Sequence, residues 1–145
     1  ADCEAARGQW VFRVLGEDVK PAIKTLKNKL DKVFSAFIRQ RGMSDQGLNR
    51  CVSCGAVLPW KRLQCGHYHR RQHLGTRWDE RNCHPQCMAC NVWRRGNYAN
   101  FAKFMYSAYS RDTMNELDIL HAQMVKLTRA DLEAKIAHFQ AQIRE

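Results

Sequence analysis

The pattern of apolar and polar positions predicts a long amphipathic helix near the start of the chain. From Val19 to Gln40, apolar residues recur at steps of three and four, and lysines fill most of the positions between them. This spacing is typical of a helix with one buried face, and Pro21 is tolerated in its first turn. The segment 41–49 contains two glycines and predicts a loop. The apolar positions are Ile23, Leu26, Leu30, Val33, Phe34, Phe37 and Ile38.

The same helical spacing returns after residue 97. Apolar residues recur from Phe101 to Leu127, and a last segment opens with Thr128 three residues before Asp131, which is an N-cap pattern. Such stripes are typical of packing surfaces. The stripes on 19–40 and 112–143 can form either the core of the monomer or a dimer surface. Trp10 to Leu15 is too short for periodicity to separate a strand from a helical turn.

Composition excludes several classes of protein. The 145 residues are 45% hydrophobic and 26% charged, which is typical of a folded protein and excludes disordered and collagenous chains. No apolar run approaches the ~18 residues that cross a bilayer, so no membrane is expected. The sequence lacks the charged and apolar pattern of an export signal. We therefore expect a reducing, cytoplasmic compartment.

The net charge of +10 is concentrated in the middle of the chain. Residues 50–97 hold nine basic and two acidic side chains, whereas residues 98–145 hold six of each. A field of this sign attracts polyanions, so nucleic acid is the favoured partner. The alternative is a basic surface kept for solubility.

Two CxxC pairs predict a structural zinc site. Cys51 and Cys54 form the first pair, and Cys87 and Cys90 form the second. Two such turns supply four thiolates to one tetrahedral ion. Disulfides are the weaker alternative without a secretion signal, and a thioredoxin-like role explains one pair only. The 32 residues between the pairs exceed the roughly 15 to 20 of an ordinary zinc ribbon, which indicates an insert.

The insert has the side chains that phosphodiester hydrolysis requires. It holds four of the six histidines together with an asparagine and several cations. Imidazoles supply a base or metal ligands, and guanidinium groups bind phosphate. These residues are His67, His69, His73, Asn82, His84, Lys61, Arg62, Arg70, Arg71, Arg77 and Arg81.

Three segments carry a resemblance to a known family. They are Cys65-Gly66-His67-Tyr68-His69, the run Arg77 to Cys87, and Cys90-Asn91 followed by Gly96-Asn97. They resemble HNH nucleases and, more closely, the phage lambda NinG (Rap) recombination endonuclease family. Asn91 and the knuckle separation are also similar to Holliday junction resolvases of the phage T4 endonuclease VII type.

The resemblance implies an α+β, mostly helical fold with a zinc-stabilised ββα-metal (HNH) core. That core is flanked by an N-terminal helix and by C-terminal helices. The expected organisation is an N-terminal segment (1–18), an amphipathic helix and loop (19–49), a zinc-bound HNH nuclease core (50–110) and C-terminal helices (111–145).

The resemblance also assigns roles to residues. His67 is the candidate general base, Asn82 braces it, and Asn91 takes the third position of the site. His69 falls on a second functional histidine, and strand alternation predicts that it shares a face with His67. Gly66 stands where many HNH enzymes have a metal-binding Asp.

The catalytic cation, Mg²⁺ or Mn²⁺, therefore has Asn91, His69 and His84 as candidate ligands, with His67 as another possible ligand. Phosphate oxygens and water complete the shell, unless Asp79 folds back to it. Two further thiols, Cys65 and Cys83, are expected to be buried beside the zinc lobe.

The expected function is metal-dependent, structure-selective nicking of branched DNA, such as Holliday junctions and D-loops, in phage recombination. The partner is branched or duplex DNA, and a homodimer suits an enzyme that must cut two strands. A phage-encoded chain would work in the host bacterial cytoplasm. The alternatives are a non-catalytic zinc module that binds DNA and an HNH nickase of another class. The candidate DNA-binding residues are Arg70, Arg71, Arg94, Arg95, Lys61 and Arg62.

Overall fold

The computed structural model describes residues 20–145 and shows an α+β protein with helices over about half of that length. The α+β expectation is confirmed, although helices do not dominate as strongly as the sequence predicted. The segment 1–18 and the run Trp10 to Leu15 lie outside the described residues. None of the helices between residues 20 and 145 is long and apolar enough to cross a membrane.

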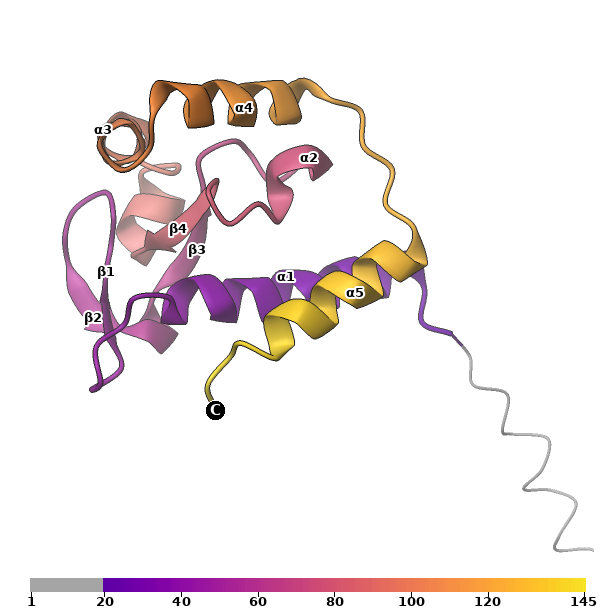
Figure 1. Ribbon diagram of the computed structural model, residues 1–145. Coiled ribbons are helices and arrows are strands. Elements are labelled where there is room, and N and C mark those ends of the chain that lie inside the picture. The colour runs from indigo at the N-terminus through magenta and orange to yellow at the C-terminus, as the bar shows by residue number, and fades with distance from the viewer. Residues whose placement is uncertain (1–19) are drawn as a thin grey trace, which may run out of the picture.

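The predicted amphipathic helix is α1, which spans Ile23–Gln40. It begins after Pro21 and not at residue 19, and Gly42, with φ of +75°, follows its end. Its apolar stripe packs against α5 (Arg129–Gln140), and the two helices lie side by side (Figure 1). The stripe therefore forms core within the chain. The shared core contains Leu26, Leu30, Phe34, Phe37, Ile38, Leu132, Ile136 and Phe139.

Two short antiparallel hairpins occupy the middle of the chain. β1 (Leu48–Arg50) pairs with β2 (Val57–Pro59), and a 3₁₀ turn, η1 (Trp60–Arg62), follows. β3 (Gln64–His67) pairs with β4 (Cys83–Gln86), with the short helix α2 (Leu74–Arg77) in their connection. A single π-helical turn, η2 (Ala89–Trp93), comes after β4. The loop predicted over 41–49 is therefore found over 41–47, because β1 begins at Leu48.

The remaining helices, α3 (Tyr98–Ala108) and α4 (Arg111–Ala122), cover the other side of the β3–β4 hairpin. Figure 1 shows three layers, with α1 and α5 on one side, the strands and α2 in the middle, and α3 and α4 opposite. A small core joins α3 and α4 through Phe101, Met105, Met114 and Leu117. The predicted start of the last helix is confirmed, because Thr128 and Asp131 form a capping box there.

Replacing Leu132 by Ala tests the packing of α5 on α1. Leu132 is fully buried, so the substitution leaves a cavity and should lower the free energy of unfolding by about 2–5 kcal/mol. Chemical denaturation followed by circular dichroism measures this. Met124→Ala is the control, because Met124 is 99% exposed and should change stability by less than about 0.5 kcal/mol. Equal effects of the two substitutions would contradict the shared core.

Candidate metal centre and cleft

The four paired cysteines come together as the sequence predicted. Cys51 and Cys54 lie in the connection between β1 and β2, and Cys87 and Cys90 follow β4. Their sulfur atoms all lie within 4.8 Å of one another, and the Sγ atoms of Cys54 and Cys87 are 3.7 Å apart. Sulfurs bound tetrahedrally to zinc at 2.3 Å stand about 3.8 Å apart. The cluster can therefore hold a zinc ion, and such an ion would join the two hairpins.

Backbone and amide donors surround these sulfurs. Burial alone would raise the pKa of Cys51, but hydrogen bonds from the backbone amides of Cys87, Cys54 and Ser53 together lower it to about 7. Asn97 donates its side-chain N–H to Cys90 Sγ at 3.3 Å. Donors of this kind favour thiolates, which are the form that binds zinc, although burial still raises the pKa of Cys90 to about 12. The Gly96-Asn97 pair noted in the sequence thus supports the metal centre.

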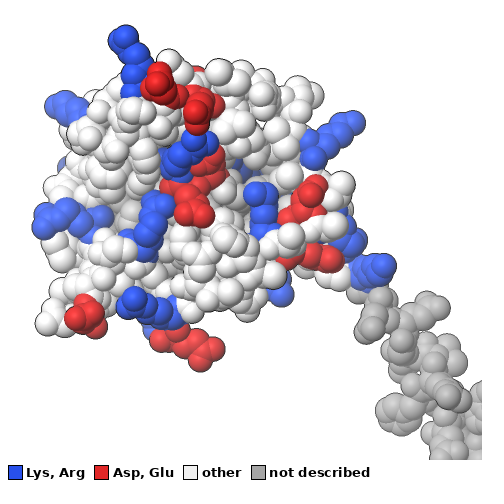
Figure 2. All heavy atoms as spheres, viewed as in Figure 1, with Lys and Arg blue, Asp and Glu red and all other residues white. Residues whose placement is uncertain are grey.

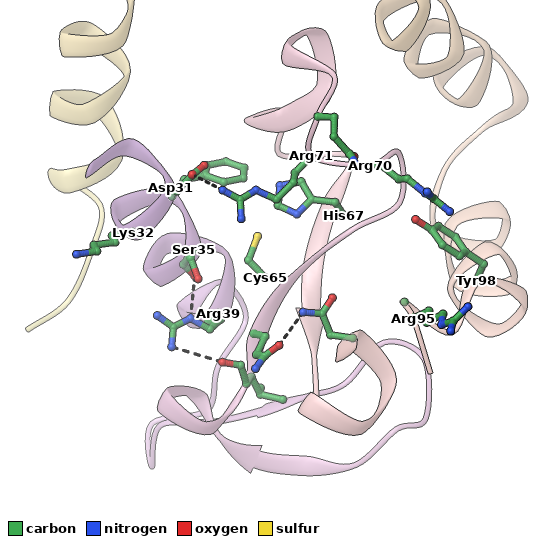
Figure 3. A pocket seen from close by; sticks show the side chains of 16 residues that line it. Asp31, Lys32, Ser35, Arg39, Cys65, His67, Arg70, Arg71, Arg95 and Tyr98 are labelled. Atoms are coloured by element: carbon green, nitrogen blue, oxygen red, sulfur yellow. Dashed lines mark hydrogen bonds and ion pairs between the residues drawn. The ribbon is translucent and has the colours of Figure 1, made fainter. Parts of the chain in front are cut away.

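A cleft of about 890 Å³ opens beside this centre. Its walls come from α1, from β3 and the loop after it, and from η2 with the turn that follows (Figure 3). Five of the residues singled out from the sequence line it together: His67, Arg70, Arg71, Asn91 and Arg95. Helix α1 adds Lys32, Arg39 and Asp31.

His67 ends strand β3 and lies in the wall of this cleft. Its Nε2 is 2.9 Å from the carbonyl oxygen of Arg77. Because a carbonyl only accepts hydrogen bonds, Nε2 carries the proton and Nδ1 of the neutral ring keeps a lone pair. Burial lowers the pKa of His67 below its usual value, and the charge of Arg71 lowers it further. The imidazole is therefore neutral near pH 7, as a base must be.

Asn82 is fully buried and holds the backbone of the loop after His67. Its side-chain oxygen accepts the N–H of His69 at 2.7 Å, and its amide nitrogen donates to the carbonyls of His69 and Thr76 at 3.0 Å each. Asn82 does not line the cleft. Its place is that of a brace for the segment between β3 and β4.

Asn91 lies in the π-helical turn η2 and faces the cleft. Its amide nitrogen donates to the side-chain oxygen of Gln64 at 2.7 Å, and both residues line the cavity. Sequence reasoning missed Gln64. Its position three residues before His67 was the available signal, but only the pairing of β3 with β4 brings it to Asn91.

His69 lies outside the cleft, contrary to the strand-face expectation. Strand β3 ends at His67, so side-chain alternation does not continue to His69. The Nε2 of His69 instead lies 2.9 Å from a carboxylate oxygen of Asp118 in α4, and its ring stacks on His121 at 4.2 Å. The structure therefore does not bring His69 together with Asn91.

His84 also lies outside the cleft, enclosed by hydrogen-bonding partners. Its Nδ1 accepts from Arg41 at 3.1 Å, and its Nε2 lies 3.0 Å from both the Arg81 carbonyl and the Tyr109 hydroxyl. Burial, with a further effect of Arg41, lowers the pKa of His84 to about 4. These contacts suit a neutral structural imidazole, and the structure does not place His84 near the other candidate cation ligands.

Ion pairs divide the cations of the insert into two groups. Asp31 of α1 binds both Arg71 at 2.8 Å and Arg77, and it also accepts from the indole of Trp78. Arg81 pairs with Asp79 and Glu116, which removes Asp79 from any cation shell in the cleft. Within residues 20–145 no ion pair involves the remaining candidates, which are Arg70, Arg94, Arg95, Lys61 and Arg62.

The candidate cations differ in where they lie. Arg94, Lys61 and Arg62 are exposed outside the cleft, whereas Arg70 and Arg95 line it. On the face drawn in Figure 2, basic and acidic side chains are interspersed, so this face carries no uniform basic patch.

Two other thiols lie away from the four-cysteine cluster. Cys83 is fully buried in the core that α1 and α5 share, and Cys65 packs against the same core. Burial raises the pKa of Cys83 well above its usual value. The expected burial is found for Cys83, but both thiols lie beside His67 and not beside the zinc lobe. The Sγ atoms of both cysteines and a ring nitrogen of His67 all lie within 4.8 Å of one another.

Together these features define an α+β protein with a four-cysteine cluster that can hold a metal ion, next to a cleft lined by cations. The chain belongs to the family described as Bacteriophage Lambda NinG protein, which it matches over residues 4–145. It is 32% identical to protein ninG of Escherichia phage 933W over 104 residues, which cover 71% of this chain and 49% of that protein.

Two further relatives match over a longer stretch. Protein ninG of Escherichia phage lambda is 29% identical over 128 residues, which cover 88% of this chain and 59% of the relative. The match to protein ninG of Salmonella phage P22 has the same identity and length, with 60% of the relative covered. The chain thus spans about half to three fifths of the length of these relatives. No solved structure matches the chain.

The buried His84 predicts a pH dependence of stability. Its pKa is depressed in the folded state, so the unfolded chain binds the proton more readily and stability falls as the pH drops from about 6.5 towards 4. The loss attributable to His84 should approach about 3 kcal/mol. The free energy of unfolding is measured at several pH values across this range for the wild type and for His84→Gln. The difference between the two proteins should shrink as the pH approaches 4. Parallel curves would contradict the assignment.

Proposed function

We propose that the chain is a metal-dependent, structure-selective DNA endonuclease that nicks branched DNA, such as Holliday junctions and D-loops, by hydrolysing a phosphodiester bond. The observation that carries this proposal is the cleft, whose wall holds a neutral imidazole, bound through Nε2 to the Arg77 carbonyl, among several cations. Those residue types match the chemistry of hydrolysis at phosphorus.

The arrangement of elements supports an HNH nuclease in particular. An antiparallel pair, β3 and β4, is followed at once by the turn η2, which gives the order strand, strand, helix. His67 ends the first strand, Asn82 begins the return to the second, and Asn91 lies on the helical turn. This order is similar to that of ββα-metal sites and of resolvases of the T4 endonuclease VII type.

In this proposal His67 is the general base. Nδ1 takes the proton from a water molecule that attacks the phosphorus, while Nε2–H stays bound to the Arg77 carbonyl and keeps the ring in one orientation. Asn82 fixes the backbone of the loop that follows His67, through two hydrogen bonds to His69. Arg77 is itself held by Asp31, so the carbonyl partner of His67 is anchored to α1.

The catalytic cation, Mg²⁺ or Mn²⁺, would be held by amide oxygens. Asn91 and Gln64 offer such oxygens side by side in the cleft, and oxygen donors are what these hard ions prefer. When bound, the ion would stabilise the negative charge that develops on the departing 3′ oxygen. Gly66 contributes no ligand. A side chain there would collide with the side chain of Gln86.

Cations of the cleft would hold the DNA backbone. Arg70, Arg95 and Lys32 are exposed along its walls, whereas the charge of Arg71 is partly neutralised by Asp31. Backbone contacts of this kind attract DNA without reading its sequence. This agrees with cutting that depends on the shape of the DNA.

An exposed aromatic side chain beside the cleft supports a preference for branched DNA. Trp93 ends η2 and is 75% exposed, two residues before Arg95. Indole rings stack on unpaired or unstacked bases, which occur at junctions and are rare within a duplex.

We propose that the enzyme works on such DNA in the host bacterial cytoplasm. We also propose that it is a homodimer, whose subunits join through surfaces other than the buried stripe of α1.

A non-catalytic zinc module that binds DNA is the second candidate. This candidate is favoured because Asp31, the carboxylate that lines the cleft, is paired with Arg71 and Arg77. A catalytic cation in the cleft would then have only neutral ligands. Nicking that requires a divalent cation separates the two candidates. An HNH nickase of another class would cut linear duplex as readily as a four-way junction.

His67→Ala tests the proposed base. The variant should lose nicking of a synthetic four-way junction in Mg²⁺ by a factor of about 10² or more, because the group proposed to take the proton from water is removed. Its affinity for the junction should change little. His138→Ala is the matched control, since His138 lies exposed on α5. The assay compares linear, single-stranded and branched DNA with and without Mg²⁺, and equal nicking by wild type and His67→Ala would refute the assignment.

Trp93→Ala tests stacking at the branch. Loss of the indole should weaken binding to a four-way junction by about 1–3 kcal/mol and leave binding to linear duplex nearly unchanged. Fluorescence anisotropy with both DNAs measures this difference. Met124→Ala removes another exposed apolar side chain and should affect neither affinity. A uniform loss on both DNAs would assign Trp93 to general binding.

A further inference from the structure

Three metal-binding side chains meet at the β3–β4 hairpin, away from the four-cysteine cluster. Cys65 and His67 are two residues apart on β3 and so share a face, and Cys83 stands opposite His67 in the register of β4. The Sγ atoms of the two cysteines and one ring nitrogen of His67 lie within 4.8 Å of one another. The proposed hydrolysis uses His67 alone and leaves both thiols without a role.

We propose that Cys65, His67 and Cys83 form a second metal site, which takes a thiophilic divalent ion of the zinc class and leaves its fourth position open to the cleft. Two thiolates and an imidazole are ligands that zinc prefers and that Mg²⁺ does not. Sites with three protein ligands keep the remaining position for water or another small ligand. Cys65 and His67 line the cleft while Cys83 lies behind them in the core, so that position faces solvent.

The orientation of His67 suits a metal ligand. A ligating histidine donates its other ring N–H to a carbonyl or carboxylate, which fixes the tautomer and the direction of the lone pair. The hydrogen bond from Nε2 to the Arg77 carbonyl does this and leaves Nδ1 without a proton. In this proposal Nδ1 is the ligating nitrogen, and the hydrogen bond of Nε2 already leaves the imidazole in the protonation state that a ligand requires.

A disulfide between the two cysteines fits the geometry less well than a shared ion. Cys65 pairs with Pro85 and Cys83 pairs with His67, so the two cysteines are diagonal neighbours across the hairpin. Diagonal positions stand about 7–8 Å apart between Cα atoms, beyond the usual Cα separation of a disulfide. An ion spans this gap because zinc holds its sulfurs about 3.8 Å apart. Both thiols are free in the structure.

Occupation of this site has a consequence for the cleft, and this step rests on the proposed function. The ion displaces two thiol protons, which leave to solvent, and binds the lone pair of Nδ1 that would otherwise accept a proton from water. His67 then no longer serves as a base. Zinc should therefore inhibit nicking that Mg²⁺ supports, and loss of either thiol should relieve that inhibition.

Metal content tests the site independently of nuclease activity. The full chain is saturated with zinc, freed of excess ion by gel filtration, and analysed for zinc per chain. We expect two ions for the wild type and one for Cys65→Ser and for Cys83→Ala. His138→Ala, which removes an exposed imidazole from α5, should keep two. Co²⁺ substitution gives a second readout, since the sulfur-to-cobalt absorption should fall in the two cysteine variants.

The outcomes separate the site from the proposed function. One ion in the wild type, or two in Cys65→Ser, would overturn the second site. If Cys83→Ala fails to fold because its thiol is buried, Cys65→Ser still decides, and circular dichroism checks its fold. For each protein, the inhibition factor is the rate of junction nicking without zinc divided by the rate with zinc. This factor should be at least ten times larger for the wild type than for Cys65→Ser. Equal inhibition would overturn the effect on His67, whereas two bound ions without any nicking would overturn only the nuclease.

Discussion

The fold depends on the joining of two small hairpins through four sulfur atoms. Neither hairpin has a strand longer than four residues, and strands this short do not hold together alone. The cluster of Cys51, Cys54, Cys87 and Cys90 connects the first hairpin to the end of the second. Gln86 reinforces this link, because its buried amide donates to Ser53 in one knuckle and to the Gly96 carbonyl beyond the other. The cluster therefore fixes η2, which carries Asn91, relative to the first hairpin.

The position of the proposed base depends on a chain of partly buried polar contacts that begins on α1. Asp31 holds Arg77, the Arg77 carbonyl holds His67, and Asn82 fixes the loop between them. Each group in the chain is satisfied by the next, which is what makes such a network rigid in a low-dielectric interior. Helix α1 is itself fixed by its packing on α5. The C-terminal helix thus supports the cleft although it contributes no residue to it.

The sequence predicted those parts of the site that local spacing determines. Two CxxC pairs, the helical stripe of α1 and the Thr128–Asp131 cap all depend on neighbours in the chain, and each is found. The resemblance assigned His67 and Asn91 to one site, and both line the cleft, where Arg95, chosen from the sequence for its charge, also lies. Gln64 and Asp31 were missed because their partners lie 27 and 40 or more residues away. His69 was misplaced because side-chain alternation was extended beyond His67, where β3 ends. His84 was misplaced because its ring packs on Phe104 of α3, and the identity of one residue does not reveal such a long-range contact.

The positive field of the cleft is assembled from distant segments and not from the basic run itself. Of the arginines between residues 70 and 81, Arg77 and Arg81 are bound by carboxylates, and Arg71 shares Asp31. The cations that remain along the cleft come from α1, the loop after β3 and the turn after η2. A surface with both signs mixed, as in Figure 2, does not attract DNA uniformly. In the proposed nuclease, the cations that line the cleft beside His67 would concentrate the attraction for phosphate there, since carboxylates bind Arg77 and Arg81 elsewhere.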